Sequence, residues 1–167
     1  VIGREQRAAS QAKCASPETG VTIGFYAQFR QAMYDVRPIA GALGAEIHNI
    51  DLTRADAPMY AEIRRLMVEY GVIFFRDQPI SPAQHKALAE SFGPLQTHPA
   101  YDTVDGFPEI TILESTPGKL TKIEAWHTDM TFRPHPPMGT VLHSKIAPVK
   151  GGDTLWACTA VAYEGLS

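Results

Sequence analysis

The stretch Trp126-His127-Thr128-Asp129 decides much of what can be predicted about this 167-residue chain. Side chains two residues apart on an extended segment project to the same side of the backbone. If this segment is extended, one nitrogen of His127 and one oxygen of Asp129 can reach a single metal ion. A histidine and a carboxylate are two of the three protein ligands in the 2-His-1-carboxylate sites of non-haem Fe(II) oxygenases. The third ligand, a second histidine, has to come from elsewhere.

The composition is that of an ordinary globular domain, with 44% hydrophobic and 9% aromatic residues. A net charge of -3 gives no reason to expect a nucleic-acid or membrane-surface partner, whereas a small anionic substrate can bind at a local basic site. Cys14 and Cys158 lie far apart and outside any C-x-x-C spacing. They therefore predict neither a disulfide framework nor a zinc knuckle, and they favour a reducing, cytoplasmic setting.

The start of the chain is predicted to differ from the rest. Residues 1–35 are rich in alanine, glutamine and serine, begin at Val1 rather than methionine, and lack the apolar region of a secretory signal. We expect them to form a poorly ordered extension, with the folded domain occupying residues 36–167. No apolar run approaches the length of about 18 residues that a membrane span requires.

Local signals predict the elements that follow. Two short strands, 36–39 and 45–47, are expected to form a hairpin-like start. A helix is predicted from the cap Asp56 to the stop Gly71, with an apolar stripe at Ile63, Leu66, Met67 and Tyr70. The continuous apolar run 72–75 is typical of a strand that is buried on both faces.

A second helix is predicted to begin at Ser81-Pro82-Ala83-Gln84, which has the pattern of a capping box with proline in the first turn. Its inner stripe is Leu88 and Phe92, and Gly93-Pro94 is expected to end it. Beyond the turn Asp105-Gly106, β-branched content predicts a strand at 109–114. Further strands are expected at 138–146 and 154–158, and a helix is expected at 160–166. A sheet core with helices on one side is the fold expected from this order.

Five short segments also carry a family resemblance, and they occur in the family's order along the chain. They are Ala42-Leu43-Gly44-Ala45-Glu46-Ile47, Gly71-Val72-Ile73-Phe74-Phe75-Arg76-Asp77-Gln78, Phe92-Gly93-Pro94-Leu95, Trp126-His127-Thr128-Asp129-Met130-Thr131-Phe132 and Gly151-Gly152-Asp153-Thr154-Leu155-Trp156. With them, residues 36–167 resemble the N-terminal half of the Fe(II)/2-oxoglutarate-dependent dioxygenases of the taurine dioxygenase group, which includes alkylsulfatases and phenoxyacetate dioxygenases. Each segment alone is weakly specific, but five in order are highly specific.

The resemblance implies an α+β, mainly β fold: a double-stranded β-helix, or jelly roll, with flanking helices, incomplete at the C-terminus of this chain. It implies that His127 and Asp129 bind Fe(II), with 2-oxoglutarate and O₂ as co-substrates. Thr154 matches the threonine whose hydroxyl contacts the distal carboxylate of 2-oxoglutarate. A neutral donor suits that role, because it can share the carboxylate with an arginine without competing charge.

The resemblance also implies a substrate site for a small organosulfonate, sulfate ester or related anion. His98 and Tyr101 match positions that line the pocket, and the backbone N–H of Met130 matches a donor to the sulfonate. Ile123 is a departure, because taurine dioxygenase has there an asparagine that helps to hold the substrate amine. An apolar side chain cannot replace it, so a more apolar sulfonate, sulfate ester or carboxylate is expected in place of taurine.

In the family, the distal iron histidine and the arginine for 2-oxoglutarate lie in later strands. This chain alone is therefore expected to bind iron poorly and not to turn over, and the full-length form is expected to be a homo-oligomer. Two alternatives remain open. One is a truncated non-catalytic module that pairs with a related subunit through its open sheet edge. The other is a metal hydrolase that uses His127, Asp129 and His135, whereas His48, His85 and His143 are interpreted as structural.

Overall fold

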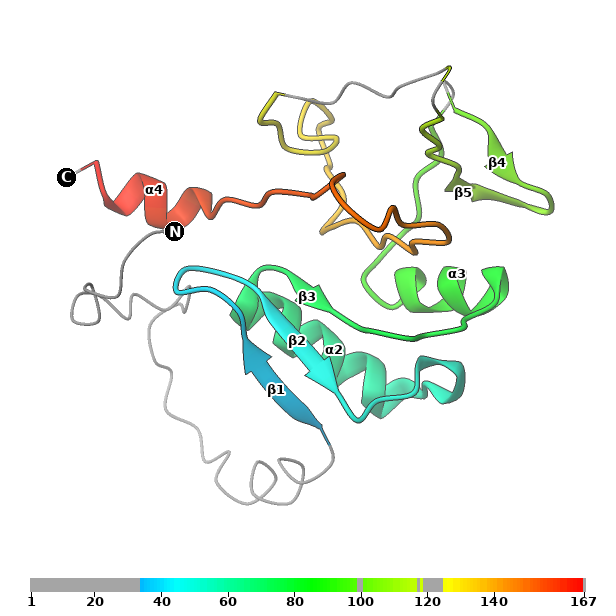
Figure 1. Ribbon diagram of the computed structural model, residues 1–167, viewed down its shortest axis with the longest axis horizontal. Helices are drawn as coiled ribbons and strands as arrows, with labels where there is room; N and C mark the ends of the chain where they lie inside the picture. Colours follow the sequence, from blue (N-terminus) through cyan, green and yellow to red (C-terminus); the bar gives the residue numbers. More distant parts are fainter. Residues whose placement is uncertain (1–33, 99–100, 117, 119–124, 167) are drawn as a thin grey trace. The chain divides into compact units, whose positions relative to one another are not determined.

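The computed structural model describes residues 34–98, 101–116, 118 and 125–166 (Figure 1). The predicted extension 1–35 thus lies almost entirely outside the described residues. The chain divides into two compact units. The first unit takes in the described parts of Val1–Asp51, Glu62–Gln78 and Lys150–Ser167, and the second takes in those of Leu52–Ala61 and Pro79–Val149.

The first unit contains a three-stranded mixed sheet in the order β1 (Asp35–Pro38), β2 (Ala45–His48), β3 (Ile73–Phe74). The antiparallel pairing of β1 with β2 confirms the predicted hairpin, and β3 runs parallel to β2. Gly44 lies in the connection with φ of +97°, and a Cβ placed there would come within 2.9 Å of Ile39 Cγ1. Glycine is required at this position, because a side chain would meet both a strained backbone and a clash.

Helix α2 (Ala57–Tyr70) covers one face of this sheet (Figure 1). The Asp56 carboxylate accepts the Met59 N–H at 2.9 Å, and the Gly71 N–H donates to the Met67 carbonyl at 2.8 Å with φ of +70° at Gly71. Both predicted ends of the helix are therefore confirmed. Leu66 is 1% exposed and packs with Ala45 and Ile47 of β2 to form the core of the first unit.

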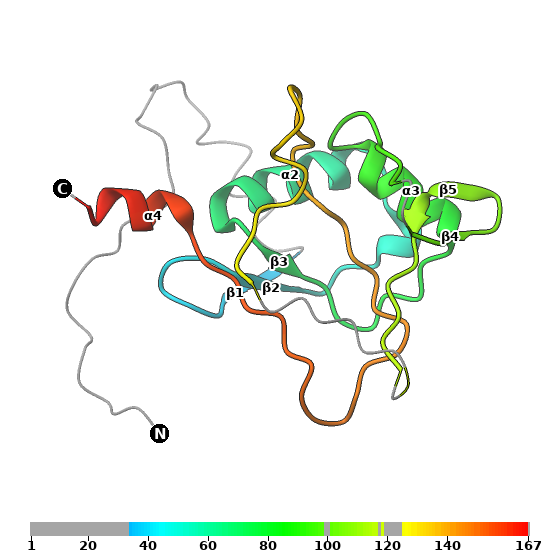
Figure 2. The same cartoon turned by 90° about the horizontal axis from the view of Figure 1, so that it is seen from above.

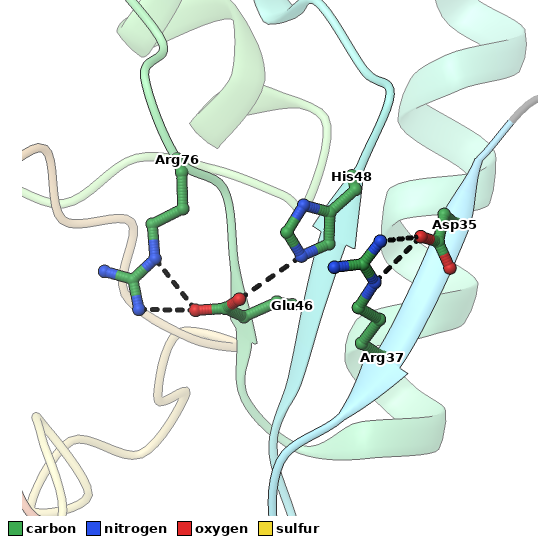
Figure 3. A network of polar contacts seen from close by, with 5 residues as sticks. All are labelled: Asp35, Arg37, Glu46, His48 and Arg76. Atoms are coloured by element: carbon green, nitrogen blue, oxygen red, sulfur yellow. Dashed lines mark hydrogen bonds and ion pairs between the residues drawn. The ribbon is translucent and has the colours of Figure 1, made fainter.

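The opposite face of β2 is polar, because side chains alternate along a strand. Figure 3 shows the Glu46 carboxylate between two partners. Its Oε1 accepts from Arg76 Nε at 2.9 Å, and its Oε2 lies 3.2 Å from His48 Nε2. The hydrogen bond from the Arg76 guanidinium is the main reason why the pKa of Glu46 is lowered from its ordinary value.

Strand β3 differs from its prediction. It comprises only Ile73 and Phe74, and both are half-buried rather than buried on both faces. Ile73 packs against the core, whereas the Phe74 ring lies 6.0 Å from the guanidinium carbon of Arg76. One face of β3 therefore meets the apolar core and the other meets the charged groups of the polar face.

The second unit contains η1 (Leu52–Arg54) and α3 (Pro82–Glu90). The predicted capping box is confirmed, because the Gln84 N–H donates to Ser81 Oγ at 3.3 Å and the Ser81 N–H donates to Gln84 Oε1 at 2.8 Å. Gln84 Nε2 also donates to the carbonyl of Thr53 at 2.8 Å, which ties α3 to η1. The helix ends at Glu90, so Leu88 is buried in it as expected while Phe92 lies beyond its end.

Strands β4 (Thr103–Val104) and β5 (Phe107–Thr111) form an antiparallel hairpin around the predicted turn Asp105-Gly106. Strand β5 is shifted toward the N-terminus relative to the predicted strand 109–114, because it begins at Phe107 and ends at Thr111. It contacts α3 (Figure 2), and Lys86 Nζ donates to Glu109 Oε1 at 2.8 Å between the two elements. This pair raises the pKa of Lys86 and lowers that of Glu109.

Among residues 125–166, the only regular element is helix α4 (Thr159–Glu164), close to its predicted place. The strands predicted at 138–146 and 154–158 do not form. Large apolar side chains of these segments are exposed, with Leu142 at 61%, Ile146 at 89% and Leu155 at 72%. A strand needs a second strand that pairs with it through backbone hydrogen bonds, and neither segment is paired in this way in the described residues.

The described residues thus show an α+β chain with two small sheets and few helices. Closure into a jelly roll remains an expectation for the whole protein. None of the described helices is long and apolar enough to cross a membrane.

Candidate metal-binding site

His127 and Asp129 lie together in the second unit. His127 Nε2 is 3.2 Å from Asp129 Oδ1, and each side chain is 56% exposed. The proximity agrees with the spacing, but the expected strand is absent: residues 126–128 form no strand and Asp129 begins a turn. The pair is therefore presented to solvent on irregular backbone rather than on a sheet.

The turn after Asp129 is well defined. Met130 has φ of +57°, and its carbonyl accepts the Arg133 N–H at 3.1 Å. The hydroxyls of Thr128 and Thr131 are 2.8 Å apart and hydrogen-bond across the turn. Such local bonds stabilise a tight turn without any strand neighbour. They explain how this segment keeps a definite shape outside a sheet.

A backbone carbonyl sets the tautomer of His127. Nδ1 lies 3.0 Å from the carbonyl oxygen of Ala125. Since a carbonyl only accepts, Nδ1 carries the proton in the neutral ring, and the lone pair is left on Nε2. That lone pair and the Asp129 carboxylate oxygen face each other at 3.2 Å and repel unless a proton or a cation lies between them. A nitrogen and an oxygen donor so arranged fit a divalent transition metal.

The described residues do not complete a metal site. Nowhere in the described ranges do three or more histidine, cysteine, aspartate or glutamate side chains gather in a way that could hold a metal ion. His135 therefore does not join His127 and Asp129, and its carbonyl instead accepts from Gln96 Nε2 at 3.3 Å. This removes the local third ligand that the hydrolase hypothesis needs.

Two of the predicted substrate residues are neighbours. The rings of His98 and Tyr101 have centroids 4.7 Å apart and planes inclined at 49°, and Tyr101 is 46% exposed. Both belong to the second unit, as do Met130 and the metal pair. The two rings are tilted against each other rather than stacked, and together they combine apolar ring faces with polar ring atoms.

The other two positions are placed differently. Thr154 is exposed, lies on irregular backbone and belongs to the first unit. Ile123 lies outside the described residues. Contacts of either residue with the metal pair are therefore not part of the observed geometry.

Sequence reasoning missed one side chain at this site. Thr140 Oγ1 donates to Asp129 Oδ2 at 3.2 Å. No spacing rule connects these positions, since the residues between them form irregular backbone. The contact of His127 with the Ala125 carbonyl could not be predicted either, because every residue has a backbone carbonyl and the sequence does not show which one accepts a hydrogen bond.

Comparison with known proteins identifies the class. Residues 35–167 match the family described as taurine catabolism dioxygenase TauD, TfdA. The chain belongs to this family, which confirms the resemblance carried by the five segments. Several relatives are named as α-ketoglutarate-dependent dioxygenases, α-ketoglutarate being another name for 2-oxoglutarate.

Three relatives show the range of the similarity. The α-ketoglutarate-dependent sulfate ester dioxygenase of Pseudomonas putida is 38% identical over 134 residues, covering 79% of this chain and 44% of the relative. The alkylsulfatase of Acinetobacter baylyi is 37% identical over 133 residues, covering 78% and 41%. The (S)-phenoxypropionate/α-ketoglutarate dioxygenase of Sphingobium herbicidovorans is 29% identical over 140 residues, covering 80% and 48%. The chain thus spans less than half the length of these relatives.

Proposed function

We propose that this chain supplies two iron ligands of an Fe(II)/2-oxoglutarate-dependent dioxygenase. The observation that carries the proposal is the convergence of His127 Nε2 and Asp129 Oδ1, 3.2 Å apart, within a chain of this family. When bound, Fe(II) with 2-oxoglutarate and O₂ supplies the oxidation, in which 2-oxoglutarate becomes succinate and CO₂ and a substrate C–H becomes C–OH.

The chain's own residues bind and orient. His127 binds the metal through Nε2 while the Ala125 carbonyl holds its Nδ1–H, an outer contact of the kind that fixes a ligating ring. Asp129 supplies one carboxylate oxygen. Thr154 donates its hydroxyl to the distal carboxylate of 2-oxoglutarate. A second histidine and an arginine are still needed, and the proposal places them C-terminal to residue 167 in the complete protein.

The proposed substrate is a small organosulfonate, sulfate ester or related anion. The names of three relatives indicate sulfate esters, alkyl sulfates and a phenoxypropionate as their substrates. His98 and Tyr101 would line the pocket and the Met130 N–H would donate to the anionic group, while Ile123 favours an apolar organic part. Hydroxylation of the carbon next to a sulfate ester oxygen gives a product that breaks down to an aldehyde and sulfate. We also propose that the complete protein is cytoplasmic and forms a homo-oligomer.

An anaerobic titration tests the proposal. Addition of Fe(II) and then 2-oxoglutarate to the complete protein is expected to produce the charge-transfer absorption of a chelated 2-oxoglutarate, and the 167-residue chain alone is expected to produce little of it. Replacing His127 with alanine in the complete protein should remove the band. A full-strength band from the His127→Ala variant would refute the ligand assignment.

A second candidate function rests on a separate observation. In the described residues β1 and β3 are the edges of their sheet, and the apolar side chains of Leu142, Ile146 and Leu155 are exposed. A chain with these features can act as a non-catalytic module that pairs with a related subunit. Sedimentation of the isolated chain distinguishes the two, because a soluble monomer that unfolds cooperatively would contradict the pairing module.

A further inference from the structure

The two oxygens of the Asp129 carboxylate have different partners. Oδ1 faces His127 Nε2 at 3.2 Å, and Oδ2 accepts from the hydroxyl of Thr140 at 3.2 Å. All three residues belong to the second unit, so this geometry is internal to one compact part of the chain. The Thr140 hydroxyl thereby holds one oxygen of the carboxylate, and the other oxygen faces the His127 ring.

A carboxylate needs such a hold, because its terminal torsion is broad and roughly two-fold, so that either oxygen can turn toward a metal. The Thr140 hydroxyl has a single O–H to donate, and an ionised acceptor makes that hydrogen bond stronger than a neutral one. Both groups are exposed, so water competes for them and the bond adds little to folding. Its effect falls on the orientation of Asp129 instead.

We propose that Thr140 is a positioning residue that selects Oδ1 of Asp129 as the metal ligand and keeps Oδ2 out of the coordination shell. Binding through one oxygen keeps more positions at the metal free for 2-oxoglutarate and O₂. Thr140 contacts neither the metal nor the substrate and acts only through Asp129. This inference rests on the proposed function, because it needs Asp129 to be a ligand.

The chain offers a matched control beside the site. Thr128 and Thr131 are hydroxyl residues of the same segment, but they bond to each other at 2.8 Å. Thr131 has no contact with either ligand among the bonds described above. Removing its hydroxyl therefore removes one hydrogen bond of the same segment and leaves the hydrogen bond between Thr140 and the Asp129 carboxylate in place.

The experiment compares Thr140→Val, Thr140→Ser and Thr131→Val in the complete protein. Mn(II) is the probe, and its free concentration is followed by electron paramagnetic resonance in the absence of 2-oxoglutarate and substrate. Outer contacts to metal ligands typically contribute about 10-fold or more to affinity, so Thr140→Val should weaken Mn(II) binding by roughly 10-fold. Thr140→Ser keeps the donor and should bind close to wild type, as should Thr131→Val.

Thermal unfolding of the metal-free variants separates orientation from folding. The metal-free Thr140→Val variant is expected to unfold at the same temperature as the wild type, while its Mn(II) affinity is lower. Equal Mn(II) affinity in Thr140→Val and wild type would overturn the role of Thr140, and so would an equal loss in Thr131→Val or in Thr140→Ser. If wild type and His127→Ala bind Mn(II) equally, the proposed function falls and the role of Thr140 falls with it. Loss in His127→Ala without loss in Thr140→Val removes the positioning role alone.

Discussion

Residues 34–111 and residues 125–166 differ in how much regular secondary structure they contain. The earlier region forms all five strands and helices α2 and α3 of the described chain, whereas the later one forms a single short helix. Yet the later region holds His127, Asp129 and Thr154. Elements with partners close along the chain form from local signals, while the segments that carry the chemistry depend on partners that the described residues do not supply.

The largest expected effect on stability is in the earlier region. Replacing Leu66 with alanine leaves a cavity between α2 and β2, where Leu66 is 1% exposed and packs on Ala45 and Ile47. A buried leucine lost in this way typically costs about 2–5 kcal/mol. Urea unfolding of the chain should show a midpoint that is much lower than that of wild type. A change of less than about 0.5 kcal/mol, the range of surface substitutions, would show that this core does not hold the region together.

A smaller effect is expected at the cap of α3. Ser81→Ala removes the oxygen that accepts the Gln84 N–H and should cost about 1 kcal/mol. Ser81→Asp keeps an acceptor and serves as the control. If alanine and aspartate give the same unfolding free energy, the capping box does not determine where α3 begins.

Acid should weaken the polar face of the first sheet. The folded-state pKa of Glu46 is lowered by Arg76, so its contribution to stability is present above the ordinary glutamate pKa of 4.5 and is lost as the pH falls through the lowered value. Glu46→Gln should therefore flatten the dependence of unfolding free energy on pH below 4.5. Part of the slope should remain, because Lys86 lowers the pKa of Glu109 in the same direction. An unchanged slope would contradict the pairing of Glu46 with Arg76.

The smallest expected effect is in the later region. Leu142→Ala changes a side chain that is 61% exposed, so the unfolding free energy of the chain should change by less than about 0.5 kcal/mol. In the complete protein, where we expect this segment to join a sheet, the same change should cost considerably more. A large cost in the isolated chain would break the comparison between the two regions.

How far prediction succeeded depends on the range of the interactions. The ends of α2 and the capping box of α3 were predicted because Asp56, Gly71 and Gln84 act within a few residues of their own position. The half-burial of β3 was not predicted, because a run of apolar residues does not show that one face of the strand lies against Glu46 and Arg76. The strands expected at 138–146 and 154–158 failed for the same reason, since pairing is a property of two segments.

The candidate site shows the same division. The nearness of His127 and Asp129 could be expected from their spacing, although a turn, not a strand, follows them. The Thr140 hydroxyl and the Ala125 carbonyl were found only in the structure, because they reach the ligands through irregular backbone. The roles of Thr154, His98, Tyr101 and Met130 remain predictions from the family.

The most direct test of the central claim is substrate-coupled succinate release by the complete protein with a sulfate ester, Fe(II), 2-oxoglutarate and O₂. His127→Ala and Asp129→Ala should each abolish it, whereas His135→Ala should retain it, because His135 is not part of the metal pair. Succinate release that survives in either ligand variant, or that is lost only in His135→Ala, would contradict the assignment of His127 and Asp129 as the iron ligands.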